Sequence, residues 1–273
     1  MHCPYCRAEN EPAFRYGGPM TVCSSCGAWF LWPPPSAADV AAHYESNRDG
    51  MPAELRTWRQ DTNQTAWYSH LAKRVLRAAG KRPVKSVVDV GAGAMELASA
   101  FSRDLPNASV EAWDLFADRE DIHSDRITTR RIDLNRLGDT PPPPGSFDVV
   151  ACVAVIEHVV DPRALLRLLR SITAPGGLTY VVGPDAGSIA HRISRKAWPY
   201  YCPDEHLTLP TLTSIDRAVS ELGGSSFRLR RIPVRYSLKY LLRYLRVPLP
   251  VPRFLDAALP IPAGAFELIW FRD

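Results

Sequence analysis

The sequence has no apolar run long enough to cross a membrane. Its longest uninterrupted run, residues 149–156, is far shorter than the roughly 18 residues that a membrane-spanning helix needs. The N-terminus also lacks a basic start followed by an apolar stretch, which is the pattern of a secretory signal peptide. We therefore expect a cytoplasmic protein without a transmembrane segment.

A strong charge of either sign is also missing. The 273 residues include 33 Lys and Arg against 29 Asp and Glu, so the net charge is only +4. Such a balance does not by itself imply a nucleic-acid partner. Hydrophobic residues make up 46% and charged residues 23%, which excludes wholesale disorder. At roughly 150 residues per domain, the length allows one large domain and a small one.

One segment lacks acidic residues altogether. No Asp or Glu lies between Glu221 and Asp256, although eight Arg and Lys residues do. Leucines in this segment recur at helical spacing, which predicts an amphipathic helix over residues 236–247. A solvated face, a site for an anionic acceptor and peripheral contact with a membrane surface are the three interpretations of this helix.

Cysteine is scarce, yet four of the six cysteines lie in the first tenth of the chain: Cys3, Cys6, Cys23 and Cys26. They form two C-x-x-C hooks, whose four thiolates can converge on one ion as the closed tetrahedral set of a structural Zn²⁺. Redox thiols or a disulfide framework are the weaker alternatives, because no secretory signal is expected. We predict a zinc ribbon over residues 1–35.

From residue 84 onward, short β-type runs alternate with helical ones. Strands are predicted at 87–90, 110–114, 126–132, 147–153, 178–182, 227–234 and 266–271, with helices from residue 96, over 164–173 and over 212–222, and a turn at 175–177. This alternation predicts an α/β fold whose parallel sheet is covered on both faces. Residues 36–83 are predicted to form a helical linker or lid, including a helix over 54–79.

A glycine turn, Gly91-Ala92-Gly93, follows Asp89 at the end of the first predicted strand. Parallel α/β sheets bind ligands at this place, just outside the carboxyl ends of the strands. Asp114 follows the second strand, at the distance at which an acidic residue takes a ribose hydroxyl pair. Asp133 follows the third strand, where it can accept from an adenine amino group.

A dinucleotide-binding fold is the competing interpretation of this turn. It needs a G-x-G-x-x-G motif with a pyrophosphate at the helix N-terminus. Here Met95 stands where many nucleotide folds keep a glycine, and Asp89 and Glu96 flank the turn. Acidic groups at these positions suit a cationic nucleoside without phosphate better than a pyrophosphate.

Taken together, the motifs resemble those of the class I S-adenosylmethionine-dependent methyltransferases. The matching segments are Asp89–Gly93, Asp114, Asp133-Leu134, Phe147–Val150, Ile156–Val159 with Asp161-Pro162, and Ala174–Gly177. The resemblance implies a Rossmann-like seven-stranded α/β sheet whose last strand is antiparallel. It assigns residues 84–273 to this domain, with insertions at about 185–208 and 236–263.

The same resemblance implies a cofactor site for S-adenosylmethionine. Its residues would be Asp89, Gly91, Ala92, Gly93, Asp114, Leu115, Asp133, Leu134 and Val153. Asp89 and the glycine turn would hold the methionine part, Asp114 the ribose hydroxyls, and Asp133 with Leu134 the adenine. For Asp133, capping its own loop is the alternative role.

The first 45 residues narrow the resemblance. Their two cysteine hooks, aromatic run and Pro-x-Pro-Ser segment are similar to bacterial methyltransferases with a fused zinc ribbon. Several of those enzymes act on nucleotide-linked deoxysugars, on surface glycans or in natural-product pathways. The resemblance thus implies a structural Zn²⁺ beside the cofactor, and a small-molecule acceptor.

Four residues are candidates for catalysis: His158, Tyr201, Glu205 and His206. The ordinary pKa of histidine suits a general base, and His158 follows the fourth predicted strand. Its alternative role is to open a helix or shape the cofactor loop. Tyr201, Glu205 and His206 lie in the first insertion, where they could bind or deprotonate a hydroxyl, or simply pin a lid.

Two other functions remain open at this point. Some ribosomal RNA methyltransferases also place a zinc knuckle ahead of this fold, and the basic segment would suit phosphate. The chain could also be a non-catalytic binding module that keeps the fold. We favour a methyltransferase for a small acceptor and expect no nucleic-acid partner.

Overall fold

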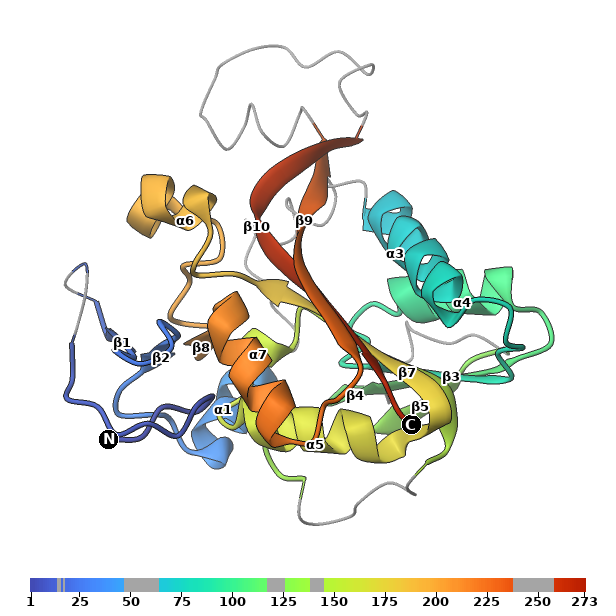
Figure 1. The fold of residues 1–273 in the computed structure, drawn as a ribbon, viewed down its shortest axis with the longest axis horizontal. Coiled ribbons are helices and arrows are strands. Elements are labelled where there is room, and N and C mark those ends of the chain that lie inside the picture. The colour runs from blue at the N-terminus through green and yellow to red at the C-terminus, as the bar shows by residue number, and fades with distance from the viewer. Residues whose placement is uncertain (14–15, 17, 47–63, 117–125, 138–144, 238–257) are drawn as a thin grey trace.

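A computed structural model describes residues 1–13, 16, 18–46, 64–116, 126–137, 145–237 and 258–273 (Figure 1). A seven-stranded sheet forms its centre, with the strand order β5-β4-β3-β6-β7-β10-β9. The strands are β3 (Ser86–Val90), β4 (Ser109–Asp114), β5 (Thr128–Arg131), β6 (Phe147–Val153), β7 (Thr173–Pro184), β9 (Phe227–Ser237) and β10 (Ala258–Phe271). Strands β3 to β7 pair in parallel, and β10 is antiparallel to both of its neighbours. The predicted seven-stranded sheet with an antiparallel last strand is thus confirmed.

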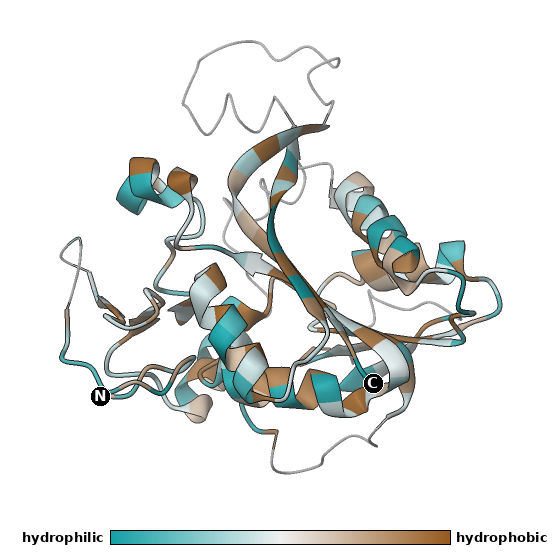
Figure 2. Ribbon diagram, in the orientation of Figure 1, coloured by the Kyte–Doolittle hydropathy of each residue, from teal (hydrophilic) through white to brown (hydrophobic). Residues whose placement is uncertain are grey.

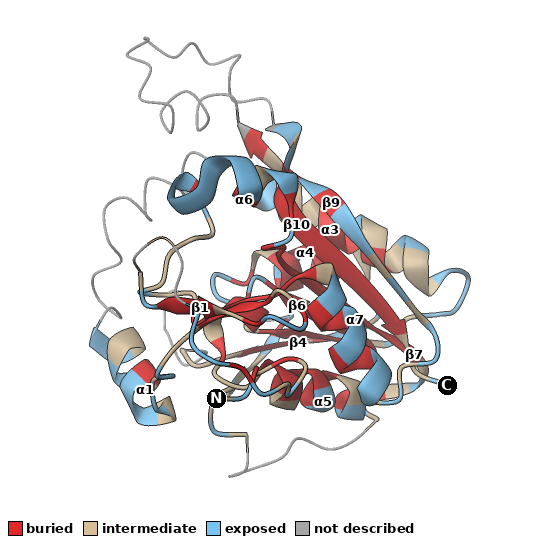
Figure 3. Cartoon of the chain, turned by 60° about the vertical axis from the view of Figure 1, so that its left-hand side comes forward, coloured by how far each residue is buried: buried red, intermediate tan, exposed pale blue. Residues whose placement is uncertain are grey.

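Helices cover both faces of this sheet, as the buried strands in Figure 3 require. Helices α3 (Gln64–Ala79) and α4 (Glu96–Asp104) pack into one hydrophobic core, and α5 (Pro162–Ile172) and α7 (Leu212–Glu221) into the other. In Figure 2 these helices carry both hydrophobic and hydrophilic residues, as amphipathic surface helices do. Strand β3 is buried from Val87 to Val90, which is expected of a parallel strand covered on both sides.

Helix starts follow from local sequence. Asp161 caps α5 by accepting hydrogen bonds from the backbone of Arg163 and Ala164, with Pro162 in the first turn. Thr211 and Ser214 form a reciprocal capping box at the start of α7.

The predicted turn at 175–177 is wrong in its detail, because these residues belong to a bulge inside β7. Thr173 pairs with Phe147, but the next paired residue, Leu178, faces Val149. Gly176 adopts a φ of +72°, and a Cβ on Gly177 would lie 2.7 Å from the carbonyl oxygen of Asp148. The two glycines let β7 bulge and then resume pairing, so the strand does not end there.

The N-terminal segment forms a hairpin of β1 (Met20–Val22) and β2 (Trp29–Leu31). A third strand, β8 (Thr208–Leu209), completes this small sheet in the order β1-β2-β8. Helix α1 (Ala37–Ser46) follows the hairpin. Since β8 comes from the far end of the first predicted insertion, the N-terminal segment and the larger domain share one sheet, which the sequence did not predict.

The two predicted insertions differ in how far they are described. The first contains α6 (Ile189–Ser194) and the short helix η3 (Arg195–Ala197). In the second, β9 extends to residue 237 and β10 begins at 258, so the helix predicted over 236–247 cannot include its first two residues. The rest of that helix, and residues 54–63 of the helix predicted over 54–79, lie outside the described residues. No helix in the described ranges is long and apolar enough to cross a bilayer.

Candidate active site

Three carboxylates lie at the carboxyl ends of neighbouring strands. Asp89 is in β3, Asp114 is the last residue of β4, and Asp133 comes two residues after β5. Asp114 accepts hydrogen bonds from the backbone N–H of Gly93, at 2.9 Å, and of Phe116, at 3.0 Å. It therefore ties the glycine turn to the end of β4. We call these three residues the acidic edge.

The glycine turn is held against β4 by its own backbone. The N–H groups of Gly91 and Ala92 both donate to the carbonyl of Trp113. Gly91 has a φ of +76°, and a Cβ there would lie 2.3 Å from the Val155 side chain. Met95, where many nucleotide folds have glycine, adopts the same left-handed conformation, with a φ of 57°. The departure at Met95 therefore leaves the path of the turn intact.

Asp89 is only 3% exposed and has a structural role of its own. Helix α4 has no side-chain cap at its first residue, and Asp89 Oδ2 accepts the hydrogen bond of the Ala98 N–H in the first turn, at 3.1 Å. Burial, with a smaller contribution from the charge of Asp114, raises the pKa of Asp89 to about 7. A cation bound beside this carboxyl would favour its ionised form.

Asp133 does cap its own loop, since its Oδ1 accepts from the Asn135 N–H at 2.9 Å. Asn135 in turn accepts from the Val160 N–H at 2.8 Å, which links this loop to the segment after β6. Leu115 and Leu134 are half-buried, and Val153 is buried at the end of β6. These apolar residues and Asp133 remain candidates for the cofactor site.

A second group of side chains gathers after β6, where the short helix η2 (Ile156–His158) begins. We call Tyr44, Glu157, His158, Glu205 and His206 the histidine corner. The two imidazole rings lie edge to face, with centroids 4.7 Å apart. His158 Nδ1 is 3.0 Å from the Glu205 carbonyl oxygen and 2.8 Å from Tyr44 Oη. His206 Nδ1 is 2.7 Å from the carbonyl oxygen of Tyr200.

These contacts fix the tautomers. Because a carbonyl oxygen only accepts, Nδ1 of each ring must carry the hydrogen, and Nε2 keeps its lone pair. Burial, and then the neighbouring His206, lower the pKa of His158 to about 3. Burial also lowers the pKa of His206 and raises that of Glu157 to about 8. All three groups are therefore neutral at pH 7.

Tyr44 connects the corner to the acidic edge. The nearby charges of Glu205, Glu157 and Asp114, added to burial, raise the pKa of its hydroxyl. Groups on both sides are thus close enough to act on one phenol. The sequence analysis missed Tyr44, which lies 114 positions before His158. Glu157 was visible beside His158 in a recognised motif but was not assigned a role.

Three of the four predicted catalytic residues, His158, Glu205 and His206, are brought together in this corner. Tyr201 is placed elsewhere. Its ring contacts Tyr16 and Trp29 of the N-terminal hairpin, at centroid distances of 5.9 and 6.1 Å. The neighbouring Tyr200 is the one whose ring stacks on His206.

Comparison with known proteins agrees with this geometry. The model of a family described as "Methyltransferase domain" matches residues 58–224, which is more than half of the chain. The chain belongs to this methyltransferase family. With the confirmed fold, it is an S-adenosylmethionine-dependent methyltransferase.

The relatives of this methyltransferase are distant. The ubiquinone biosynthesis O-methyltransferase of Psychrobacter arcticus is 33% identical over 102 residues, 34% of this chain and 38% of that protein. The same enzyme of Ralstonia nicotianae is 32% identical over 114 residues, 36% and 41% of the two chains. The methyltransferase therefore spans less than half the length of these relatives.

Solved structures share its fold. A plantazolicin methyltransferase, BpumL, solved with a desmethyl-plantazolicin analogue and SAH, is 15% identical with a TM-score of 0.56, covering 87% of this chain and 96% of that one. A SAM-dependent methyltransferase of Archaeoglobus fulgidus is 16% identical with a TM-score of 0.51, covering 75% and 94%.

The four N-terminal cysteines of the methyltransferase have the geometry of a metal site. Cys3 Sγ lies 3.6 Å from Cys26 Sγ, and Cys6 Sγ lies 3.6 Å from Cys23 Sγ. All four sulfurs are within 4.8 Å of one another, and none is in a disulfide. A tetrahedral Zn²⁺ with bonds of 2.3 Å needs sulfurs ~3.8 Å apart, so the quartet fits this ion.

The cysteine hooks are anchored to the methyltransferase domain next to the histidine corner. Tyr5 Oη is 2.9 Å from Thr208 Oγ1, and Thr208 donates to the carbonyl of Ile156. Thr211 Oγ1 donates to the carbonyl of Cys26, at 2.7 Å. Through these bonds the hooks, η2 and β8 form one buried unit.

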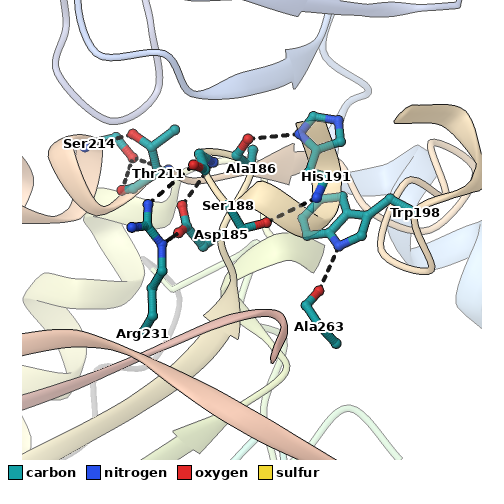
Figure 4. A network of polar contacts seen from close by, with 10 residues as sticks. Asp185, Ala186, Ser188, His191, Trp198, Thr211, Ser214, Arg231 and Ala263 are labelled. Carbon is teal, nitrogen blue, oxygen red and sulfur yellow. Dashed lines mark hydrogen bonds and ion pairs between the residues drawn. The ribbon is translucent and has the colours of Figure 1, made fainter. Parts of the chain in front are cut away.

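The first insertion is fastened to the sheet by a polar network, drawn in Figure 4. The fully buried Asp185 pairs with Arg231 of β9 at 2.5 Å. Ser188 caps α6, and Trp198 Nε1 donates to the carbonyl of Ala263 in β10. The insertion that ends in Glu205 and His206 is therefore a packed element of the fold.

Proposed function

We propose that this methyltransferase transfers a methyl group from S-adenosylmethionine to a small biosynthetic acceptor seated at the histidine corner. The proposal is carried by one observation, that neutral imidazoles with unengaged lone pairs lie beside the acidic edge. Nucleotide-linked sugars, glycan precursors and natural-product intermediates are the acceptor classes that we favour. Relatives named for ubiquinone biosynthesis and plantazolicin, rather than for a nucleic acid, support a small acceptor.

The acidic edge and the glycine turn would hold the cofactor. Asp114 would accept both ribose hydroxyls, and Asp133, Leu115, Leu134 and Val153 would surround the adenine. Asp89 and the backbone of Gly91, Ala92 and Gly93 would face the methionine part. When bound, the cofactor supplies a methyl group made electrophilic by its sulfonium. The protein's part is to orient the acceptor toward it, exclude water and remove a proton.

The acceptor proton would leave toward the histidine corner. Nε2 of His206 or of His158 can accept it, since Nδ1 of each ring is held by a carbonyl. The Glu205 side chain and Tyr201 remain candidates for contacts to the acceptor. The four cysteines would hold a structural Zn²⁺, because a closed Cys₄ set leaves no open position for chemistry.

Cofactor affinity should depend on the protonation of Asp89. Its pKa of about 7 means that the carboxyl ionises as the pH rises through neutrality. A cationic methionine ammonium favours the ionised form, so the affinity for S-adenosylhomocysteine should rise roughly tenfold from pH 6 to pH 8. Calorimetry at a series of pH values measures this. The Asp89→Asn variant should bind with little pH dependence, and a flat profile in the unmodified chain would contradict the assignment.

The function is tested by replacing His206 with glutamine, which keeps a polar side chain but offers no basic nitrogen. Formation of S-adenosylhomocysteine with a panel of nucleotide sugars and hydroxylated small molecules should fall at least 100-fold, as loss of a general acid or base does. Affinity for S-adenosylhomocysteine should stay within twofold. Methylation of bulk RNA in preference to every small acceptor, or full activity of the variant, would argue against the proposal.

A further inference from the structure

The histidine corner contains a set of donor atoms that neither the fold nor the proposed methyl transfer explains. One carboxylate oxygen of Glu157 and one ring nitrogen each of His158 and His206 lie within 4.8 Å of one another. The same limit encloses the four sulfurs of the N-terminal hooks. Two imidazoles and one carboxylate are a recurrent ligand set for divalent transition metals.

Both imidazoles are in the state that a metal ligand requires. Each Nδ1–H donates to a backbone carbonyl, of Glu205 and of Tyr200. Metal-binding histidines typically give the N–H that faces away from the ion to such an acceptor, because this fixes the tautomer and orients the ring. Within the described residues, Nε2 of neither ring has a hydrogen-bond partner, so both lone pairs remain for a ligand.

Glu157 supplies an independent reason. The residue is 1% exposed, and its Oε2 has no hydrogen-bond partner within the described part of the chain. A buried carboxylate without a donor is unfavourable unless it is paired or binds a metal. Nearby backbone contacts hold it in place, since the Leu207 N–H donates to the Glu157 carbonyl at 2.7 Å. Glu157 and His206 therefore stay close, with one residue between the two segments.

We propose that Glu157, His158 and His206 bind a divalent transition-metal ion, and that this ion holds an oxygen of the acceptor. This inference rests on the proposed function, because the ion would act on the same acceptor. It would be distinct from the ion of the cysteine hooks. Three protein ligands leave coordination positions open, as catalytic metals require and a Cys₄ site does not allow.

The ion would define the acceptor as a hydroxyl compound with a second oxygen beside the first, able to chelate through adjacent open positions. Binding to the cation lowers the pKa of the hydroxyl, and its proton passes to solvent water. The resulting oxyanion forms the new O–CH₃ bond while the S–CH₃ bond breaks, and the bonding electron pair stays on sulfur, giving a neutral thioether. In this state the imidazoles are ligands, and neither of them accepts the proton.

The test uses the full chain with its cysteine-bound zinc retained and Mn²⁺ alone as the probe. Electron paramagnetic resonance of free Mn²⁺ should show one ion bound per chain. Glu157→Gln and His206→Gln should each weaken this binding at least tenfold. His191→Gln is the matched control: the Nδ1 of His191 also donates to a carbonyl, that of Ala186, and its Nε2 is buried without a partner, but it lies outside the cluster. Its Mn²⁺ affinity should equal that of the unmodified chain.

Calorimetry with S-adenosylhomocysteine on the same samples separates the two proposals. If this ligand binds but no Mn²⁺ does, or if Glu157→Gln binds Mn²⁺ unchanged while remaining folded by circular dichroism, the metal proposal fails and the proposed function stands. If S-adenosylhomocysteine does not bind at all, the proposed function fails. Binding of both, with the loss confined to the corner variants, supports the metal site.

Discussion

Replacing Cys26 with serine is expected to remove zinc from the N-terminal hooks and to lower methyl transfer more than 100-fold. Structural zinc contributes ~10–16 kcal/mol to small zinc domains, so a lost ligand unfolds the hooks. The damage should spread, because the Cys26 carbonyl accepts from Thr211, and Tyr5 contacts Thr208. Both contacts border the segment that carries His206.

Zinc analysis, thermal unfolding and activity on the same sample measure this effect. Affinity for S-adenosylhomocysteine should change by less than threefold, since the acidic edge lies on other strands. Cys202→Ser is the control, because Cys202 is also half-buried but lies outside the quartet. A Cys26→Ser variant with full activity, or an unmodified chain with far less than one zinc, would contradict the prediction.

The second large effect is expected at Asp114. Its replacement by alanine removes the acceptor for both ribose hydroxyls, and hydrogen bonds to a charged group contribute about 1.5–3 kcal/mol each. S-adenosylmethionine should therefore bind roughly 100-fold more weakly or worse. The Gly93 N–H also loses its acceptor, so the glycine turn loses its tie to β4.

Asp148 offers a matched control for this variant. It also accepts backbone hydrogen bonds, from Lys85 at 2.8 Å and Ser86 at 3.1 Å, but at the amino end of the strands. Asp148→Ala should lower the melting temperature and leave cofactor affinity unchanged. Equal affinity losses in both variants would indicate a general loss of packing rather than a lost ribose contact.

The sheet was predictable because each parallel strand is a short apolar run followed by a turn or an acid, as in Val87–Val90 before Gly91. Strand β6 begins and ends at the predicted residues. Strand β8 was not predictable, since Thr208 and Leu209 are too few to show a period and their partner is β2. The bulge at Gly176 depends on how β7 resumes pairing, which no local signal encodes.

The candidate site divides in the same way. Asp89, Asp114 and Asp133 could be grouped from sequence, because parallel strands bring their carboxyl ends to one edge. The pairing of His158 with His206 depends on how the first insertion folds back onto η2. The position of Tyr44 depends on the packing of α1. Tyr201 was chosen for its chemistry, but its neighbours are set by the aromatic side chains of the N-terminal hairpin.

The strand shared by the two domains bears on how the protein is made. Trp29 pairs with Leu209, roughly 180 residues further along the chain. During synthesis the two cysteine hooks emerge first and can take up an ion at once, whereas the outer edge of β2 waits for nearly the whole polypeptide. An unpaired edge with Trp29 and Phe30 invites aggregation. Zinc supply should therefore matter most while the nascent chain is still on the ribosome, before β8 closes that edge.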